Sequence, residues 1–221
     1  MRVAAEFHRV GLCRRVIFYR PQRHPRDPII GIWESHRAVA RHACERGHER
    51  ILVLEDDVRF TRALRPRKLR SIARAMRALP ADWQIFYLGH WALRARFVRR
   101  NVLRTQSACT HAYIANGSGL TWLAARAYER IQLDHRWTRV IGRGLDSAFA
   151  SLGTTYAYFP LVAIQDTSPS DHLRPERRGR IRKLRQLITH TRAREILLSK
   201  LMIPNQFLVV FFSLWPRGQR T

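Results

Sequence analysis

Hydrophobic and polar positions in the first half of the chain follow two alternating periods. Residues 35–46 place apolar side chains on one face at helical spacing, and Ser35 in front of them is a typical N-cap residue. The four apolar residues 51–54 predict a buried strand, and a second helical stripe covers 69–76. Residues 84–88 predict another strand. The order helix, strand, helix, strand indicates an α/β fold with a largely parallel sheet.

Shorter elements follow in the second half. Pro160 interrupts the last strand pattern, which is typical of an edge or bulged strand. The predicted elements are a strand at 112–114, a helix at 120–131, a short helix at 145–152 and a strand at 156–164. Together these segments predict one domain over residues 1–173.

The composition changes in the tail, residues 174–221. Its first part is rich in arginine, with apolar residues at helical spacing, and its last part is strongly apolar. A basic amphipathic helix beside an apolar, tryptophan-bearing end is typical of a segment that lies in a membrane interface. The alternative is a C-terminal helix that packs on the domain or on a second subunit.

The charge of the chain is extreme. Lys and Arg number 41 against 16 Asp and Glu, which gives a formal net charge of +25. Nucleic acid, an anionic membrane or a phosphate-bearing substrate would each explain such an excess, and so would mutational bias toward arginine codons. The three cysteines form no close pair, which favours a reduced, cytosolic compartment. No signal peptide and no run of about 18 apolar residues is expected.

Three consecutive acids, Glu55, Asp56 and Asp57, follow the predicted strand 51–54. Adjacent carboxylates repel one another unless a cation or several donors lie between them. Mg²⁺ and Mn²⁺ favour such oxygen ligands, and ligands of α/β sheets gather at the carboxyl ends of strands. The triplet therefore predicts a metal site, with solvated loop acids or helix N-cap acids as the alternative.

An ordered set of motifs resembles glycosyltransferase family 25, the bacterial lipooligosaccharide galactosyltransferases and the related collagen galactosyltransferases. The matching segments are residues 31–37, 50–58, 82–89 and 110–114, then Asp146, Pro160, Gln165 and the pair Ser170-Asp171. The resemblance covers residues 31–172. The chain is expected to lack the strand and the arginine-bearing loop with which the family usually begins.

The resemblance implies a GT-A-like, Rossmann-like fold with a mixed, mostly parallel sheet and helices on both faces. It implies an inverting, metal-assisted transfer, with UDP-galactose as donor and a lipooligosaccharide or another glycan as acceptor. Asp146 is the candidate base, although it could instead be a helix N-terminal carboxylate. The other implied roles are metal binding by Asp57 and Asp171, with Mn²⁺ or Mg²⁺, and donor binding by Glu55, Asp56, Ser35 and His36. His172 is a further candidate ligand, for which a solvent histidine is the favoured alternative. Ser35 and His36 could instead begin a helix and shape the site without taking part in the chemistry.

Two other functional classes remain open at this stage. A basic nucleic-acid-binding module has only the charge in its favour, because no recognisable binding motif accompanies it. An inactive or scaffold homologue without a complete donor site is the other. The basic tail further suggests peripheral attachment to the inner face of the cytoplasmic membrane, where a lipid-linked acceptor would be reached.

Overall fold

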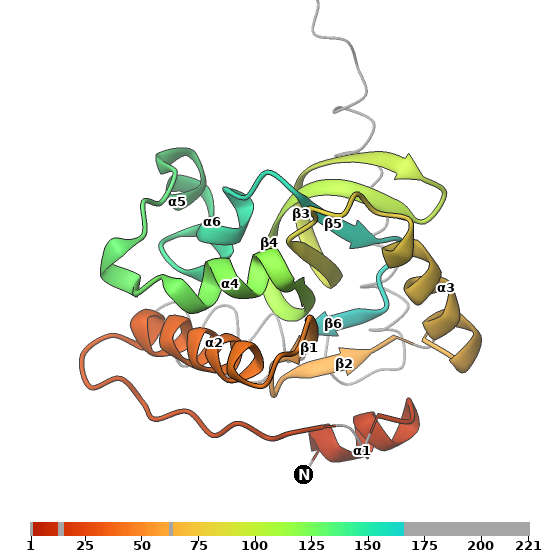
Figure 1. The fold of residues 1–221 in the computed structure, drawn as a ribbon, viewed down its shortest axis with the longest axis horizontal. Helices are drawn as coiled ribbons and strands as arrows, with labels where there is room; N and C mark the ends of the chain where they lie inside the picture. Colours follow the sequence, from red (N-terminus) through yellow and green to blue (C-terminus); the bar gives the residue numbers. More distant parts are fainter. Residues whose placement is uncertain (1, 13–15, 62–63, 166–221) are drawn as a thin grey trace, which may run out of the picture.

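The computed structural model describes residues 2–12, 16–61 and 64–165. Asp171, His172, the domain boundary at residue 173 and the tail at 174–221 lie outside this range, so the predictions made for them stay predictions. The described part is an α/β structure with one main sheet, a small second sheet and helices (Figure 1).

The main sheet has four strands in the order β1-β4-β3-β5. They are β1 (Arg50–Leu54), β3 (Ile85–Arg99), β4 (Val102–Asn116) and β5 (Thr155–Tyr158). Strands β1 and β4, and strands β3 and β4, run antiparallel, and only β3 and β5 run parallel. The sheet is therefore mixed, as predicted, but the prediction that it is mostly parallel is wrong for the described residues.

A long β3–β4 hairpin explains the difference. The strand predicted at 84–88 continues past Gly89 to Arg99, because register shifts on both sides of Gly89 let the ladder pass the glycine. Beyond it, Ala92 and Ala95 are buried while arginines between and after them face outward. The chain then turns back directly into β4, so an antiparallel neighbour replaces the expected crossover.

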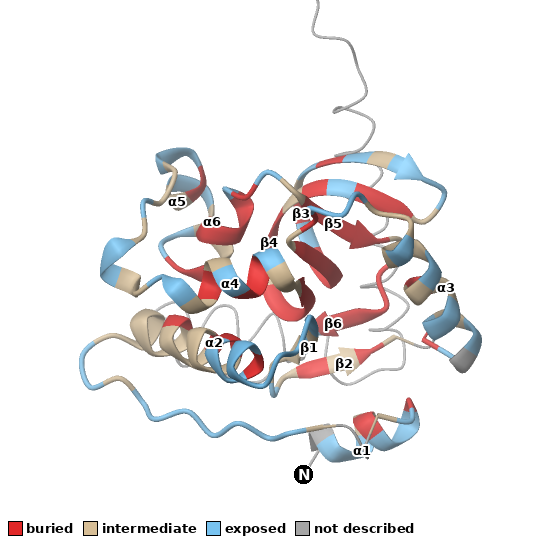
Figure 2. Ribbon diagram, viewed as in Figure 1, coloured by how far each residue is buried: buried red, intermediate tan, exposed pale blue. Residues whose placement is uncertain are grey.

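Successive residues of the strands point to opposite faces of the main sheet, and each face carries its own hydrophobic core. On one face, Tyr87 and Tyr113 pack with the helices α2 (Pro28–Glu45), α4 (Gly117–Ala125) and α6 (Leu145–Ala150). On the other, Phe86 and Ile114 pack with the elements α1 (Arg2–Arg9), α3 (Pro66–Arg77), β2 (Val58–Phe60) and β6 (Ala163–Gln165). Figure 2 shows the buried positions concentrated between these layers. Helical cover on both faces is thus confirmed.

Several boundaries differ from the predictions. Helix α2 begins at Pro28, where the Asp27 side chain accepts a hydrogen bond from the Ile29 amide (2.9 Å), so Ser35 lies inside the helix and is not its N-cap. The helix predicted at 120–131 ends at Ala125 and is followed by a 3₁₀ turn at Tyr128–Arg130 and by α5 (His135–Ile141). The pattern at 156–164 divides into β5 and β6, which belong to different sheets.

The strand β1, the helix α3 and the short helix α6 are found close to their predicted positions. No strand precedes β1 within the described residues. In that same part of the chain, no helix is both long and apolar enough to cross a lipid bilayer.

Gly119 gives a test of the packing between α4 and the main sheet. A Cβ atom at Gly119 would lie 2.3 Å from the Gln84 carbonyl oxygen, whereas a Cβ at Gly117, two residues earlier, would lie 3.8 Å from its nearest neighbour, the Glu49 oxygen. We expect Gly119→Ala to lower the unfolding free energy by about 1–3 kcal/mol in a urea titration, because backbone must shift. Gly117→Ala is the matched control and should be neutral or slightly stabilising. Equal values for the two variants would contradict this packing.

Candidate active site

The acidic triplet lies where β1 leaves the sheet. Leu54 pairs with Ala112 at the end of the β1–β4 ladder, and the Glu55 amide extends the ladder by donating to the His111 carbonyl (3.0 Å). The Val58 amide then donates to the Glu55 carbonyl (3.2 Å), which closes a tight turn before β2. This geometry holds Glu55 against the sheet and leaves Asp56 exposed at the turn.

Glu55 has a strongly altered acidity. Its Oε1 accepts a hydrogen bond from the Thr110 hydroxyl (2.9 Å), and the His36 Nε2 lies 3.7 Å away. The pKa of Glu55 is raised to about 8, chiefly by burial and then by the charges of Asp57, Asp146 and, less strongly, Asp56, while the Thr110 hydrogen bond partly opposes the shift. The carboxyl group of Glu55 therefore holds a proton in most molecules at pH 7.

His36 presents a neutral imidazole to this carboxyl group. It lies on α2, stacks on the Tyr113 ring (centroids 5.7 Å apart, planes at 20°) and forms a 2.8 Å hydrogen bond between Nδ1 and the Tyr113 hydroxyl. Burial lowers the pKa of His36 to about 4 and raises that of Tyr113 well above its usual value. We infer that the phenol donates to Nδ1, which leaves the imidazole proton on Nε2, the nitrogen that faces Glu55.

Asp57 and Asp146 complete an acidic cluster built from two distant segments. Asp57 accepts a hydrogen bond from the Gln165 amide nitrogen of β6 (2.8 Å), which fixes its carboxylate beside the start of β2. Asp146, the second residue of α6, lies close enough for its charge to raise the pKa of both Glu55 and Cys109. The structure thus brings together three of the predicted site residues, Glu55, Asp57 and Asp146, with His36 beside them.

The other predicted site residues are placed less favourably. The Ser35 hydroxyl donates to the Gly31 carbonyl one helical turn earlier (2.6 Å), so its hydrogen-bonding capacity is used within α2. Asp56 points to solvent at the turn. Asp171 lies outside the described residues, six positions after Gln165.

The donor chemistry of the cluster fits a hard divalent cation. In the described part of the chain no three His, Cys, Asp or Glu side chains are arranged to hold a metal by themselves. Mg²⁺, however, is commonly held by one or two carboxylates while water and substrate phosphate oxygens complete its shell. Asp57 supplies one such carboxylate. A bound cation would also reduce the repulsion between the negative charges around Glu55.

Cys109 marks backbone strain beside the cluster and was not predicted as a site residue. Its φ of 72° is the one positive value at a non-glycine position among the described residues. Burial, together with the charges of Asp146, Glu55 and Asp57, raises the pKa of its thiol to about 12, so no thiolate forms near pH 7. Two further residues contact the cluster: Thr110, which follows Cys109, and Tyr113. Both lie in the 110–114 segment, and the family motif there was the one indication in the sequence that this segment belongs to the site.

Two more buried histidines lie on the same stretch of the hairpin. Neither nitrogen of His90 has a hydrogen-bond partner among the described residues. Burial lowers the pKa of His90 to about 3, with His111 contributing, and the pKa of His111 to about 4, which the Ala163 backbone partly opposes. Gly89 makes room for this arrangement, because a Cβ there would lie 2.1 Å from the His111 Nε2.

Comparison of the chain with known protein families and with curated proteins gives no match.

Replacing Glu55 tests the raised pKa of this half-buried carboxyl group. The folded-state pKa is raised, so the stability that this group contributes is complete below about pH 4.5 and is lost as the pH rises through about 8. Glu55→Gln keeps an acceptor for Thr110 but cannot ionise. We therefore expect the variant to exceed the wild type in unfolding free energy by a few kcal/mol at pH 8.5 and to converge with it at pH 4.5. Exposed Glu49→Gln is the control, and parallel pH profiles for wild type and Glu55→Gln would contradict the burial.

Replacing His90 tests the opposite dependence. Its folded-state pKa is lowered, so the stability contributed by the neutral imidazole is present above about pH 6.5 and is lost as the pH falls toward 3. We expect His90→Leu to match or exceed the wild type at pH 7, because it removes polar atoms without partners. Between pH 6 and 4 the unfolding free energy of the wild type should fall with decreasing pH more steeply than that of His90→Leu. The two slopes should differ by about 1.4 kcal/mol per pH unit. Exposed His42→Gln is the control, and a slope in His90→Leu equal to that of the wild type would overturn the assignment.

Proposed function

We propose that this protein is a glycosyltransferase of the GT-A type that moves galactose from UDP-galactose to a lipooligosaccharide or another glycan acceptor, with inversion. One observation carries the proposal. Asp146 lies near Glu55 and Asp57, although about ninety residues separate them in the sequence. The motif resemblance to glycosyltransferase family 25 assigns to these same positions the base and the metal–donor contacts.

The geometry supports a division of labour within the cluster. Asp146 is the proposed base, which would take the proton of the acceptor hydroxyl as the bond to the sugar forms. Glu55, paired with Thr110 and facing His36, offers a proton-bearing carboxyl group and a neutral imidazole for hydrogen bonds to the ribose or the sugar of the donor. Asp56, exposed at the turn, is free of the sheet and can approach the donor from solvent.

A divalent ion, Mn²⁺ or Mg²⁺, would neutralise charge on the leaving UDP when bound. Asp57 would hold it, with Asp171 as the second proposed ligand. The hydrogen bond from Gln165 keeps the Asp57 carboxylate oriented before any ligand arrives, and that orientation lowers the entropy lost on binding.

The excess of positive charge agrees with a phosphate-bearing donor and an acceptor on an anionic surface. We place the protein in the cytoplasm, peripherally on the inner face of the cytoplasmic membrane. The alternative is an inactive or scaffold homologue, which would share the fold and the acidic cluster without binding a nucleotide sugar.

Two isosteric substitutions test the proposal. Asp57→Asn retains an acceptor for Gln165, and Asp146→Asn retains the shape of the side chain in α6. We expect Asp57→Asn to lose Mn²⁺-dependent UDP-galactose binding, measured by calorimetry. Asp146→Asn should retain donor binding but lower turnover at least about 100-fold, because it removes the base.

Thermal melts followed by circular dichroism provide the folding control for both variants. Absence of UDP-galactose binding by the wild type in the presence of Mn²⁺ would refute the enzyme and favour the scaffold. Retained turnover in Asp146→Asn would assign the base elsewhere and leave the donor site intact.

A further inference from the structure

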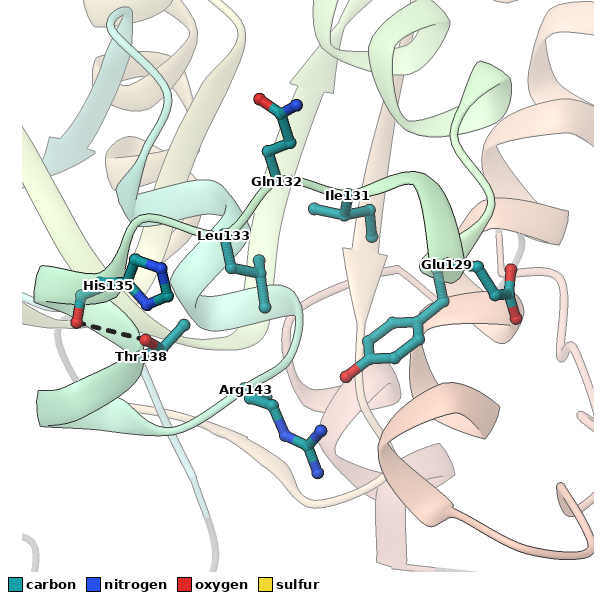
Figure 3. A pocket seen from close by; sticks show the side chains of 8 residues that line it. Glu129, Ile131, Gln132, Leu133, His135, Thr138 and Arg143 are labelled. Atoms are coloured by element: carbon teal, nitrogen blue, oxygen red, sulfur yellow. Dashed lines mark hydrogen bonds between the residues drawn. The ribbon is translucent and has the colours of Figure 1, made fainter.

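A hollow of about 650 Å³ lies between the segment that follows α4 and the helix α5 with the loop after it. Figure 3 shows Ile131 and Leu133 on one wall and Arg143 on another, with Glu129 on the side away from His135. The lining combines apolar surface with hydroxyl, amide and charged groups. This mixture is typical of a site for a sugar, whose rings have apolar faces and hydroxyl edges.

Backbone geometry presents Arg143 to this hollow. The arginine stands between Gly142 (φ 83°) and Gly144 (φ 140°), two conformations that residues with a side chain rarely adopt. Arg143 is exposed, and its guanidinium has no ion-pair or hydrogen-bond partner among the described residues. The charge is therefore available to a ligand.

Charge around the hollow is predominantly positive. Residues 126–143 contain five arginines and two acids. One of these acids, Asp134, is bound to Arg136 (2.6 Å), and the other, Glu129, lies on the lining. A ligand with one anionic group would accordingly place that group at Arg143 and its hydroxyls toward Glu129, which accepts hydrogen bonds but repels a second anion.

The hollow lies within reach of the proposed chemistry. Arg143 and Asp146 are three positions apart in the sequence, so their Cα atoms are at most about 11 Å apart. A glycan seated in the hollow could thus extend one end to the Asp146 carboxylate while its charged group stays at Arg143.

We propose that this hollow is the acceptor site and that it selects a glycan bearing a phosphate or carboxylate group, with Arg143 as the residue that determines the specificity. This inference rests on the proposed glycosyltransferase function and names the chemical class of its acceptor. Arg143 binds and orients the acceptor and takes no part in proton transfer.

Binding of simple sugars to the full chain tests the proposal without the donor. The probes are glucose 6-phosphate, methyl glucuronide and methyl glucoside, titrated at 0.15 M salt and followed by ligand-observed NMR. We expect one or both anionic probes to bind about tenfold more tightly than methyl glucoside, and the comparison of the two distinguishes phosphate from carboxylate. Arg143→Gln should abolish this preference, and Arg143→Lys should keep part of it.

Arg139→Gln is the matched control, because Arg139 is also exposed in this segment but does not line the hollow. Its affinity for the probes should equal that of the wild type. Equal losses in Arg143→Gln and Arg139→Gln would show unspecific attraction to a basic surface and would overturn the proposal, as would equal binding of charged and neutral sugars.

UDP-galactose binding, measured in parallel, separates the two hypotheses. Arg143→Gln should bind the donor as the wild type does, because the arginine lies outside the acidic cluster. A wild type that binds the anionic sugars through Arg143 but binds no donor would refute the transferase and keep the site. Donor binding without any Arg143-dependent sugar preference would refute the acceptor site alone.

Discussion

A half-buried, protonated carboxyl group where β1 leaves the sheet is the constraint on which the site depends. The Glu55 amide donates a hydrogen bond to the His111 carbonyl, and the Glu55 carboxyl group accepts one from the Thr110 hydroxyl. Ionised acids close to one another repel strongly when water is excluded, and Glu55 avoids this cost by keeping its proton. A ligand that binds the charged form of Glu55 must displace that proton, so its apparent affinity at pH 7 is lower than for an acid that is already ionised, and it rises as the pH approaches 8.

The hairpin is irregular where it lies beside the acidic cluster. Register shifts around Gly89 and the positive φ of Cys109 face each other across β3 and β4, and they bring Thr110 and His111 to the end of β1. A regular ladder would alternate these side chains between the two faces of the sheet. The strain and the buried imidazoles thus accompany the cluster, as is common where a bulge lies beside a functional site.

The sequence predicted the parts of the fold that local patterns determine. The apolar run of β1 and the amphipathic stripe of α3 were located correctly. The family motifs named the acid triplet and Asp146 as parts of one site. The β3–β4 hairpin was missed because Gly89 and the arginines after it resemble the end of a strand, and only pairing with β4 makes them extended. Ser35 was misread for a related reason: a hydroxyl before an apolar stripe signals an N-cap, but Asp27 and Pro28 begin the helix two turns earlier. Tertiary proximity, such as that of Thr110 and Tyr113 to Glu55, has no local signature.

The position of β1 in the strand order has a further consequence. It is an edge strand of five residues, bonded on one side to β4 alone. Detaching β1 would break one short ladder and leave the β3–β4 hairpin in place. The free energy of this local opening is therefore lower than that of global unfolding. Glu55 directly follows β1 and would leave with it, whereas the Gln165 side chain on β6 would still hold Asp57 beside β2. The cluster would therefore lose its proton-bearing carboxyl group before the rest of the sheet is disturbed.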